Sequence, residues 1–314
     1  MVTIELRPGV CKGLYVNTPR LLSLSLAVSL LASLSGCSKN NDDGGGGPGT
    51  PPCPPAPNAP VVYSAIGASD AMGVGGSVPC LPFTDCPNGT GYVPRIARQL
   101  EADGHAVTVR NLGLPGAVLS PSIQDIGNQV GLGINANILV QEAPFVATDA
   151  TLVTVFAGAN DANALGTAVD RGAAGSTDPN AFIDQYIRNF ATDYTTLIRT
   201  IRDRAPNARI IVMNLPNLSG LPYMAGRSAQ HRRWIQRAAV GFSTAGANVQ
   251  AQNSVLVVDL LCDARSYQSG NYSSDGFHPD DSGYAFLAGE VLQAVGATSW
   301  PAPAASCPQM TLVQ

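Results

Sequence analysis

Short apolar runs rich in β-branched residues alternate along this chain with longer amphipathic segments. The apolar runs predict strands, and the segments in which apolar residues recur every three or four positions predict helices. The expected strands are 61–67, 106–111, 151–157, 209–214 and 255–260. The expected helices are 92–103, 181–204, 227–252 and 281–295, the last beginning at an Asp cap within 279–282.

Strands that alternate with helices indicate an α/β fold in which helices cover both faces of a parallel sheet. We therefore expect a three-layer sandwich with a central five-stranded parallel sheet flanked by helices. Ligands of such folds bind at the carboxyl ends of the strands. The residues that directly follow each expected strand are therefore the first candidates for chemistry.

The N-terminal part of the chain has the pattern of a targeting segment. Basic residues precede an apolar run at 21–34, which is shorter than the roughly 20 residues of a membrane-spanning helix. The run ends in Leu34-Ser35-Gly36-Cys37, which resembles a bacterial lipobox, where the Cys is lipidated. We expect 1–36 to be a lipoprotein signal peptide, although an ordinary cleavable signal with an incidental Cys stays open. By resemblance to lipoprotein sorting, Ser38 favours the outer membrane.

Composition sets the limits of the remaining chain. Residues 37–60 are rich in Gly and Pro and predict a tether, which leaves 61–314 as one globular domain. Of the 314 residues, 45% are hydrophobic, which excludes disorder of the whole chain, and a net charge of −4 offers no footprint for nucleic acid. Lysine occurs only at Lys12 and Lys39, which excludes a lysine Schiff base or phosphate-loop lysine in the body.

The cysteines predict export to an oxidising compartment. Cys80 and Cys86 bracket a short loop, and we expect them to form a disulfide. Cys262 has two possible partners, Cys307 and Cys53, and the sequence does not choose between them. No His stands at ligand spacing from a Cys, so we expect no metal site.

Three short motifs directly follow the first three expected strands. A fourth lies near the C-terminus, beyond the fifth expected strand. Each alone is weak, because a Ser–Asp pair after a strand is usually a helix cap and an Asn–Asp pair is usually a turn. Together and in this order they carry more weight. They are Gly67-Ala68-Ser69-Asp70-Ala71, Asn111-Leu112-Gly113-Leu114-Pro115-Gly116-Ala117, Gly158-Ala159-Asn160-Asp161 and Asp275-Gly276-Phe277-His278-Pro279.

The set resembles the SGNH hydrolases, also called the GDSL esterase/lipase family, over 61–296. The resemblance implies a flavodoxin-like fold, a catalytic Ser69 with Asp275 and His278, and an oxyanion hole from Ser69, Gly116 and Asn160. It implies no metal and no organic cofactor. Ala68 stands where the family often has Asp, a position that is not itself catalytic. Gly113 is a rival for Gly116, which is preferred for its spacing from Asn111.

The residues support this interpretation on physical grounds. A serine hydroxyl needs a base to remove its proton, and His278 alone among the three His has a carboxylate three residues earlier in a loop. His105 and His231 are interpreted as structural or solvated. Asp70 and Asp161 are interpreted as supporting or capping groups. The Ser69 amide is expected at the start of a helix, whose dipole would assist the oxyanion.

The sequence predicts the substrate less specifically than it predicts the catalytic residues. Long insertions at 73–94, 114–149 and 162–180 are expected to form the walls of the cleft and are rich in apolar residues. They favour a neutral carboxylic ester, either a small molecule or a lipid, although the same residues could simply pack the loops together. A carbohydrate O-deacetylase and a non-catalytic surface binding protein are the alternatives. A lipid anchor would hold the enzyme, taken as a monomer, at the membrane.

Overall fold

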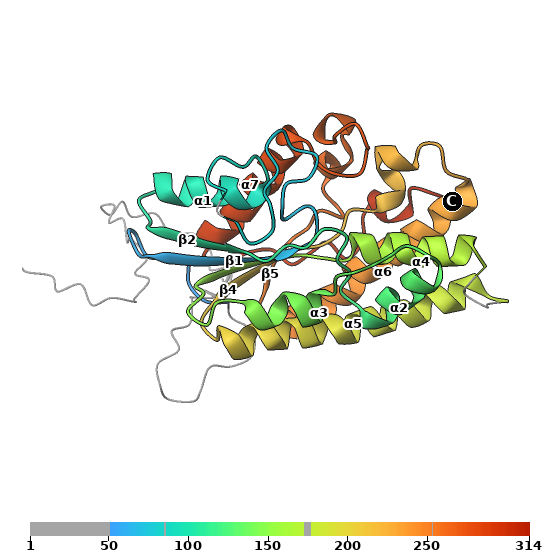
Figure 1. The fold of residues 1–314 in the computed structure, drawn as a ribbon, viewed down its shortest axis with the longest axis horizontal. Helices are drawn as coiled ribbons and strands as arrows, with labels where there is room; N and C mark the ends of the chain where they lie inside the picture. Colours follow the sequence, from blue (N-terminus) through green and yellow to red (C-terminus); the bar gives the residue numbers. More distant parts are fainter. Residues whose placement is uncertain (1–50, 85, 173–176, 253) are drawn as a thin grey trace, which may run out of the picture.

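The computed structural model describes residues 51–84, 86–172, 177–252 and 254–314. Its centre is a parallel sheet of five strands in the order β2-β1-β3-β4-β5 (Figure 1). The sheet confirms the predicted fold class, and each strand lies within its predicted range. The strands are β1 Val61–Gly67, β2 Val107–Asn111, β3 Leu152–Phe156, β4 Arg209–Met213 and β5 Leu256–Val258.

The strand order creates a switch point between β1 and β3. From β1 the chain crosses to β2 on one side, and it then returns across β1 to β3 on the other side. Connections therefore leave the carboxyl ends of β1 and β3 in opposite directions, which opens a crevice between them. This is the place where open α/β sheets bind their ligands.

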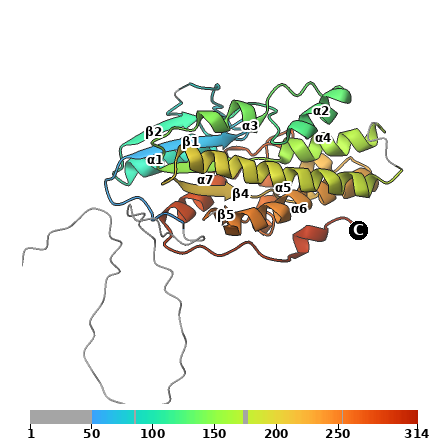
Figure 2. The same cartoon turned by 90° about the horizontal axis from the view of Figure 1, so that it is seen from below.

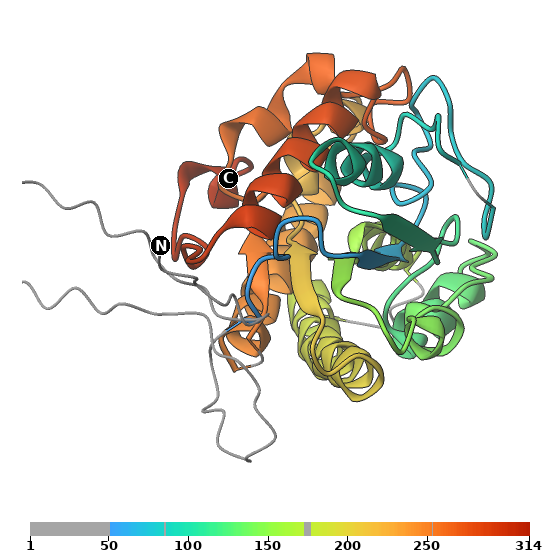
Figure 3. The same cartoon turned by 90° about the vertical axis from the view of Figure 1, so that its left-hand side faces the viewer.

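Helices cover both faces of the sheet, as Figures 1 and 3 show. α1 (Tyr92–Ala102) and α7 (Asp281–Gly296) lie on one face. α3 (Ile138–Gln141), α5 (Pro179–Arg204) and α6 (Ala229–Gln252) lie on the other. The four predicted helices are confirmed, with ends that differ by at most two residues.

Two further helices stand where the sequence predicted only loops. α2 (Pro121–Gln129) lies within the expected insertion 114–149, and α4 (Ala159–Asp170) overlaps the expected insertion 162–180. The apolar side chains of α4 are mostly Ala and it is buried on several sides, so it lacks a clear apolar stripe. A Cβ at Gly166 would lie 2.4 Å from the Ile235 side chain, so this helix packs closely against α6.

Burial explains why the central strands were easy to recognise. Every residue of β3 and β4 is buried, because helices cover both faces of the sheet there. β2 lies at the edge of the sheet, and its residues alternate between half-buried and exposed.

Phe190 of α5 stacks on Phe242 of α6 with ring centroids 4.1 Å apart, which joins two helices of one face.

Two disulfides close loops of very different length. Cys80 is bonded to Cys86, and Cys262 is bonded to Cys307, which resolves the open pairing of Cys262. The second disulfide helps to hold the C-terminal segment, which runs back along the body towards α6 (Figure 2). There the side-chain amide of Gln236 donates to the Val313 carbonyl oxygen at 2.8 Å.

The proposed signal peptide, Cys37 and most of the tether lie outside the described residues. Within the described ranges, no helix combines the length and apolar character that crossing a bilayer requires. In the same ranges, no three His, Cys, Asp or Glu residues gather as a metal site would need.

Candidate active site

Ser69 stands in a tight turn directly after the carboxyl end of β1. The Met72 N–H donates to the Ser69 carbonyl oxygen, and the Gly73 N–H donates to that of Asp70. These bonds form successive turns but no helix, so the expected helix dipole at Ser69 is wrong. The turns run through Gly73 to Gly75. The φ of Gly73, +75°, is left-handed, and its missing Cβ allows close approach to Gly91. α1 begins only at Tyr92.

His278 reaches Ser69 from the loop between β5 and α7. The His278 Nε2 lies 2.8 Å from the Ser69 Oγ, and the His278 Nδ1 lies 2.6 Å from the Asp275 Oδ2. The fold therefore brings Ser69 into contact with His278 and Asp275, although Ser69 and His278 are 209 positions apart in the sequence. Ser69 is buried, with 6% of its surface exposed.

Asp275 is held as a hydrogen-bond acceptor by its own loop. Its Oδ1 accepts from the N–H groups of Phe277 and His278 and from the Ser273 hydroxyl, at 2.8–2.9 Å. Partial burial tends to raise the pKa of Asp275, but the His278 ring and these donors lower it to about 2. Because an ionised carboxylate can only accept, Nδ1 of His278 carries the ring proton and Nε2 accepts from the Ser69 hydroxyl.

The loop after Ser69 packs directly against the loop that carries His278. A Cβ at Gly75, where φ is +95°, would lie 2.8 Å from the His278 Cβ and 2.6 Å from the Pro279 carbonyl oxygen. The Tyr284 hydroxyl of α7 donates to the Val74 carbonyl oxygen at 2.6 Å. A larger residue at position 75 would therefore separate the base from the nucleophile.

Gly116 is better placed than Gly113 to supply an oxyanion donor. The Gly113 N–H already donates to the Asn111 side chain at 3.1 Å, and Gly113 is buried against Ala71. Gly116 is exposed in a turn with φ of +73°, and its N–H has no acceptor in the described part of the chain. Asn160 contacts the same loop, because its side-chain amide donates to the Ala117 carbonyl oxygen at 2.9 Å. One N–H of that amide remains for a substrate.

Asp161 supports this loop and does not face the reacting atoms. Its fully buried carboxyl accepts from the N–H groups of Leu119 and Ser120 at 3.0–3.1 Å. The Ser120 hydroxyl in turn donates to Asp193 of α5. Sequence reasoning did not identify Asp193, because the helical pattern of α5 marks it only as a polar position.

Asp70 lies behind the nucleophile, at the wall of a small cavity of about 40 Å³. Asp70, Ala159 and Phe277, the chain neighbours of Ser69, Asn160 and His278, all line this cavity. Burial raises the pKa of Asp70, and the nearby charge of His278 opposes that rise. Asp70 is therefore a buried acid whose charge interacts with that of the base.

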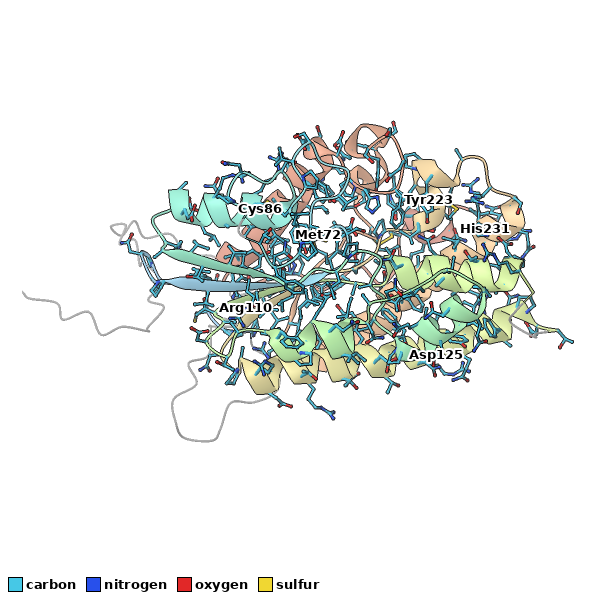
Figure 4. All side chains as sticks on the ribbon, in the orientation of Figure 1. Met72, Cys86, Arg110, Asp125, Tyr223 and His231 are labelled. Atoms are coloured by element: carbon cyan, nitrogen blue, oxygen red, sulfur yellow. A yellow bond between two sulfur atoms is a disulfide. The ribbon has the colours of Figure 1, made fainter. Side chains whose placement is uncertain are left out.

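The other two histidines have structural partners of their own. The His105 Nδ1 lies 2.8 Å from the Ala59 carbonyl oxygen. His231 of α6 is buried and pairs with Asp170 at the end of α4. Figure 4 shows His231 well to the right of Met72, which lies three residues beyond Ser69.

Two aromatic side chains, Tyr223 and Phe277, lie beside the base. The Tyr223 ring meets Phe277 edge to face at 4.9 Å, and Phe277 meets the His278 ring in the same way at 5.0 Å. The Tyr223 hydroxyl donates to Asn163 of α4 at 2.9 Å, which ties this wall to the helix that follows Asn160. Tyr267 instead donates to the Leu261 carbonyl oxygen and supports the fold.

Two solved lipase structures share the fold of this chain. A lipase from a goat rumen metagenome is 19% identical, with a TM-score of 0.51 over 75% of this chain and 97% of that protein. An extracellular lipase from Streptomyces rimosus is also 19% identical, with a TM-score of 0.50 over 74% of this chain and 99% of that one. At this identity the likeness shows the fold. No curated protein sequence matches the chain. The model of the GDSL-like lipase/acylhydrolase family matches residues 65–286, and the chain belongs to that family of carboxylic ester hydrolases.

Proposed function

We propose that this hydrolase cleaves esters through a Ser69–His278–Asp275 triad and an acyl-enzyme. The observation that carries the proposal is the continuous hydrogen-bonded chain from Asp275 through His278 to Ser69, at 2.6 and 2.8 Å. This arrangement lets the imidazole take the hydroxyl proton while the carboxylate holds the ring in the required tautomer.

The reaction proceeds in two acyl-transfer steps. The Ser69 Oγ attacks the ester carbonyl carbon as the His278 Nε2 removes its proton, and Asp275 stabilises the imidazolium that forms. The carbonyl oxygen becomes an oxyanion, which accepts from the N–H groups of Ser69 and Gly116 and from the Asn160 amide. The tetrahedral intermediate collapses as His278 protonates the leaving alcohol, and water then repeats the sequence on the acyl-enzyme.

The substrate that best fits the site is a neutral carboxylic ester. Tyr223 and Phe277 place an aromatic wall next to His278, and such a wall favours apolar or aryl groups over charged ones. Asp275 is ionised beside the base, and its charge disfavours an anionic substrate.

The experiment is the hydrolysis of p-nitrophenyl acetate, butyrate and octanoate by the purified protein and by Ser69→Ala. We expect the wild type to turn over these esters and Ser69→Ala to lose about 10³-fold or more in kcat, with an unchanged circular dichroism spectrum. Labelling by a fluorophosphonate provides a second readout of Ser69. A wild type that releases acetate from acetylated xylan but ignores all three esters would favour an O-deacetylase, and one that neither hydrolyses nor labels would refute the triad.

We propose further that the enzyme is exported and anchored by lipid at Cys37 to the cell envelope, at the outer membrane. The lipobox-like sequence before Cys37 supports the anchor, and the two disulfides support an oxidising compartment. Expression in a bacterial host with Cys37→Ala should move the protein from the detergent phase to the aqueous phase on Triton X-114 partitioning. Equal partitioning of the variant and the wild type would refute the anchor.

A further inference from the structure

Glu142 is a buried acid that no sequence motif marks. It follows α3 and leads into a short 3-10 helix, and its exposed fraction is 0%. Its Oε2 accepts from the Gly67 N–H at 2.9 Å, and its Oε1 has no hydrogen-bond partner among the described residues. Burying a carboxyl with one unpaired oxygen costs free energy of folding. Glu142 therefore lowers the stability of the fold unless its other contacts offset that cost.

The end of the sheet explains why Gly67 needs a side-chain acceptor. β2 ends at Asn111, which pairs with Ala65, and the chain beyond it stays beside β1 only through single hydrogen bonds. One of these joins the Leu114 N–H to the Gly67 carbonyl oxygen at 3.3 Å. The N–H and C=O of a strand residue point to the same side, so the Gly67 N–H also faces this gap, and Glu142 fills it.

Glu142 therefore binds Gly67, the residue that links the nucleophile turn at Ser69 to the oxyanion turn at Gly116. Gly67 stands two positions before the nucleophile Ser69, and Leu114 stands two positions before Gly116. We propose that Glu142 is a positioning residue, which sets the separation between the nucleophile turn and the oxyanion turn by clamping Gly67. This inference rests on the proposed function of Ser69 and Gly116.

The protonation of Glu142 suits this task. Burial raises the pKa of Glu142 well above its usual range, and the N–H groups of Gly67 and Leu114 lower it only in part. The protonated form still offers a carbonyl oxygen to the Gly67 N–H. Glutamine has the same shape and also offers that oxygen, whereas methionine has a similar length and offers only a weak acceptor.

The test compares Glu142→Met and Glu142→Gln in the intact protein on a p-nitrophenyl ester. Misplacing catalytic groups by about 1 Å costs on the order of 10²-fold, so we expect Glu142→Met to lose about that much in kcat while KM changes little. We expect Glu142→Gln to recover most of the loss. The rate of fluorophosphonate labelling of Ser69 should follow the same order.

Ser64→Ala is the matched control. The Ser64 hydroxyl of β1 accepts from the Ala147 N–H at 3.2 Å, so it links the same strand to the same segment by the same kind of bond, away from both turns. We expect Ser64→Ala to lower the melting temperature and to leave kcat unchanged. If Glu142→Met does not fold, Glu142→Asp, which is shorter by one methylene, replaces it with the same expected loss.

The outcomes separate this inference from the proposed function. A folded Glu142→Met with the kcat of Ser64→Ala would overturn the positioning role while leaving the triad intact. A Glu142→Gln variant as impaired as Glu142→Met would also overturn it, because the oxygen acceptor would then be irrelevant. A wild type that neither hydrolyses esters nor labels at Ser69 would overturn the proposed function, and the positioning role with it.

Discussion

Two aspartates near the site have pKa values that move in opposite directions because their surroundings differ. Asp275 is partly exposed, and its several donors lower its pKa to about 2. Asp161 is fully buried, and this burial raises its pKa to about 7 although Leu119 and Ser120 donate to it. Asp275 is therefore ionised wherever His278 acts as a base, whereas Asp161 changes charge near neutral pH.

The titration of Asp161 predicts a pH-dependent stability. A carboxyl with a raised folded pKa stabilises the fold fully below its ordinary value of 3.8, and that contribution is lost as the pH rises through about 7. Between pH 4 and pH 8, we expect the wild type to lose on the order of 4 kcal/mol relative to Asp161→Asn, which cannot ionise. Urea unfolding of both proteins across this range measures the difference. A constant difference would show that Asp161 does not titrate there.

At the scale of the element, α7 holds both sides of the catalytic contact. Its N-cap Asp280 accepts from the N–H groups of Ser282 and Gly283 at 2.8–2.9 Å and lies two residues beyond His278. In its first turn, Asp281 accepts from the Ser77 hydroxyl and N–H at 2.7–2.8 Å, within the loop that follows the nucleophile. The start of this helix therefore fixes the base and the nucleophile loop together.

Removal of this cap should affect stability and catalysis at once. We expect Asp280→Ala to cost about 1 kcal/mol of stability and also to lower kcat, because the His278 loop loses its anchor. Asp178→Ala is the control, since Asp178 caps α5 in the same way, by accepting from Asn180 and Ala181. We expect it to cost similar stability with an unchanged kcat. Chemical unfolding and ester hydrolysis check both, and equal kcat values would contradict the prediction.

At the scale of the whole molecule, the strand order brings distant parts of the chain into one crevice. Ser69 follows β1 and Asn160 follows β3, the two strands that flank the switch point. His278 follows β5 at the far edge of the sheet, and its loop must extend back across the sheet to reach Ser69. The same loop between β5 and α7 contains Cys262, which the disulfide to Cys307 joins to the C-terminal segment.

The two disulfides should differ in their contribution to stability. In the chain-entropy account, removing Cys262–Cys307, with a sequence separation of 45, costs about 4 kcal/mol. Removing Cys80–Cys86, with a separation of 6, costs about 2 kcal/mol in the same account. Urea unfolding of the two paired Cys→Ser variants measures both values. A larger loss for the Cys80–Cys86 variant would show that local strain or packing outweighs the loop term.

The sequence predicted those features that neighbouring residues encode. The strands β3 and β4 have continuous apolar runs, and α5 has a clear helical period, so their patterns are strong. The prediction was wrong for α2, which is only nine residues long and whose only large apolar side chains are two isoleucines. It was wrong for α4, whose apolar residues are mostly Ala and give weak contrast. It was also wrong after Ser69, where the chain forms turns that include two glycines with positive φ, Gly73 and Gly75, in place of a helix.

The sequence by itself determined the fold class and the order of the candidate catalytic residues, because both depend on local pattern and on motifs of a few residues. Only the tertiary structure decided which cysteine pairs with Cys262 and which glycine of the second motif has an N–H without an acceptor among the described residues. It also decided that Glu142 accepts from the Gly67 N–H, just before the nucleophile turn. These features depend on contacts between segments far apart in the chain. Such contacts follow from the order of the strands and the paths of the loops, which no local pattern encodes.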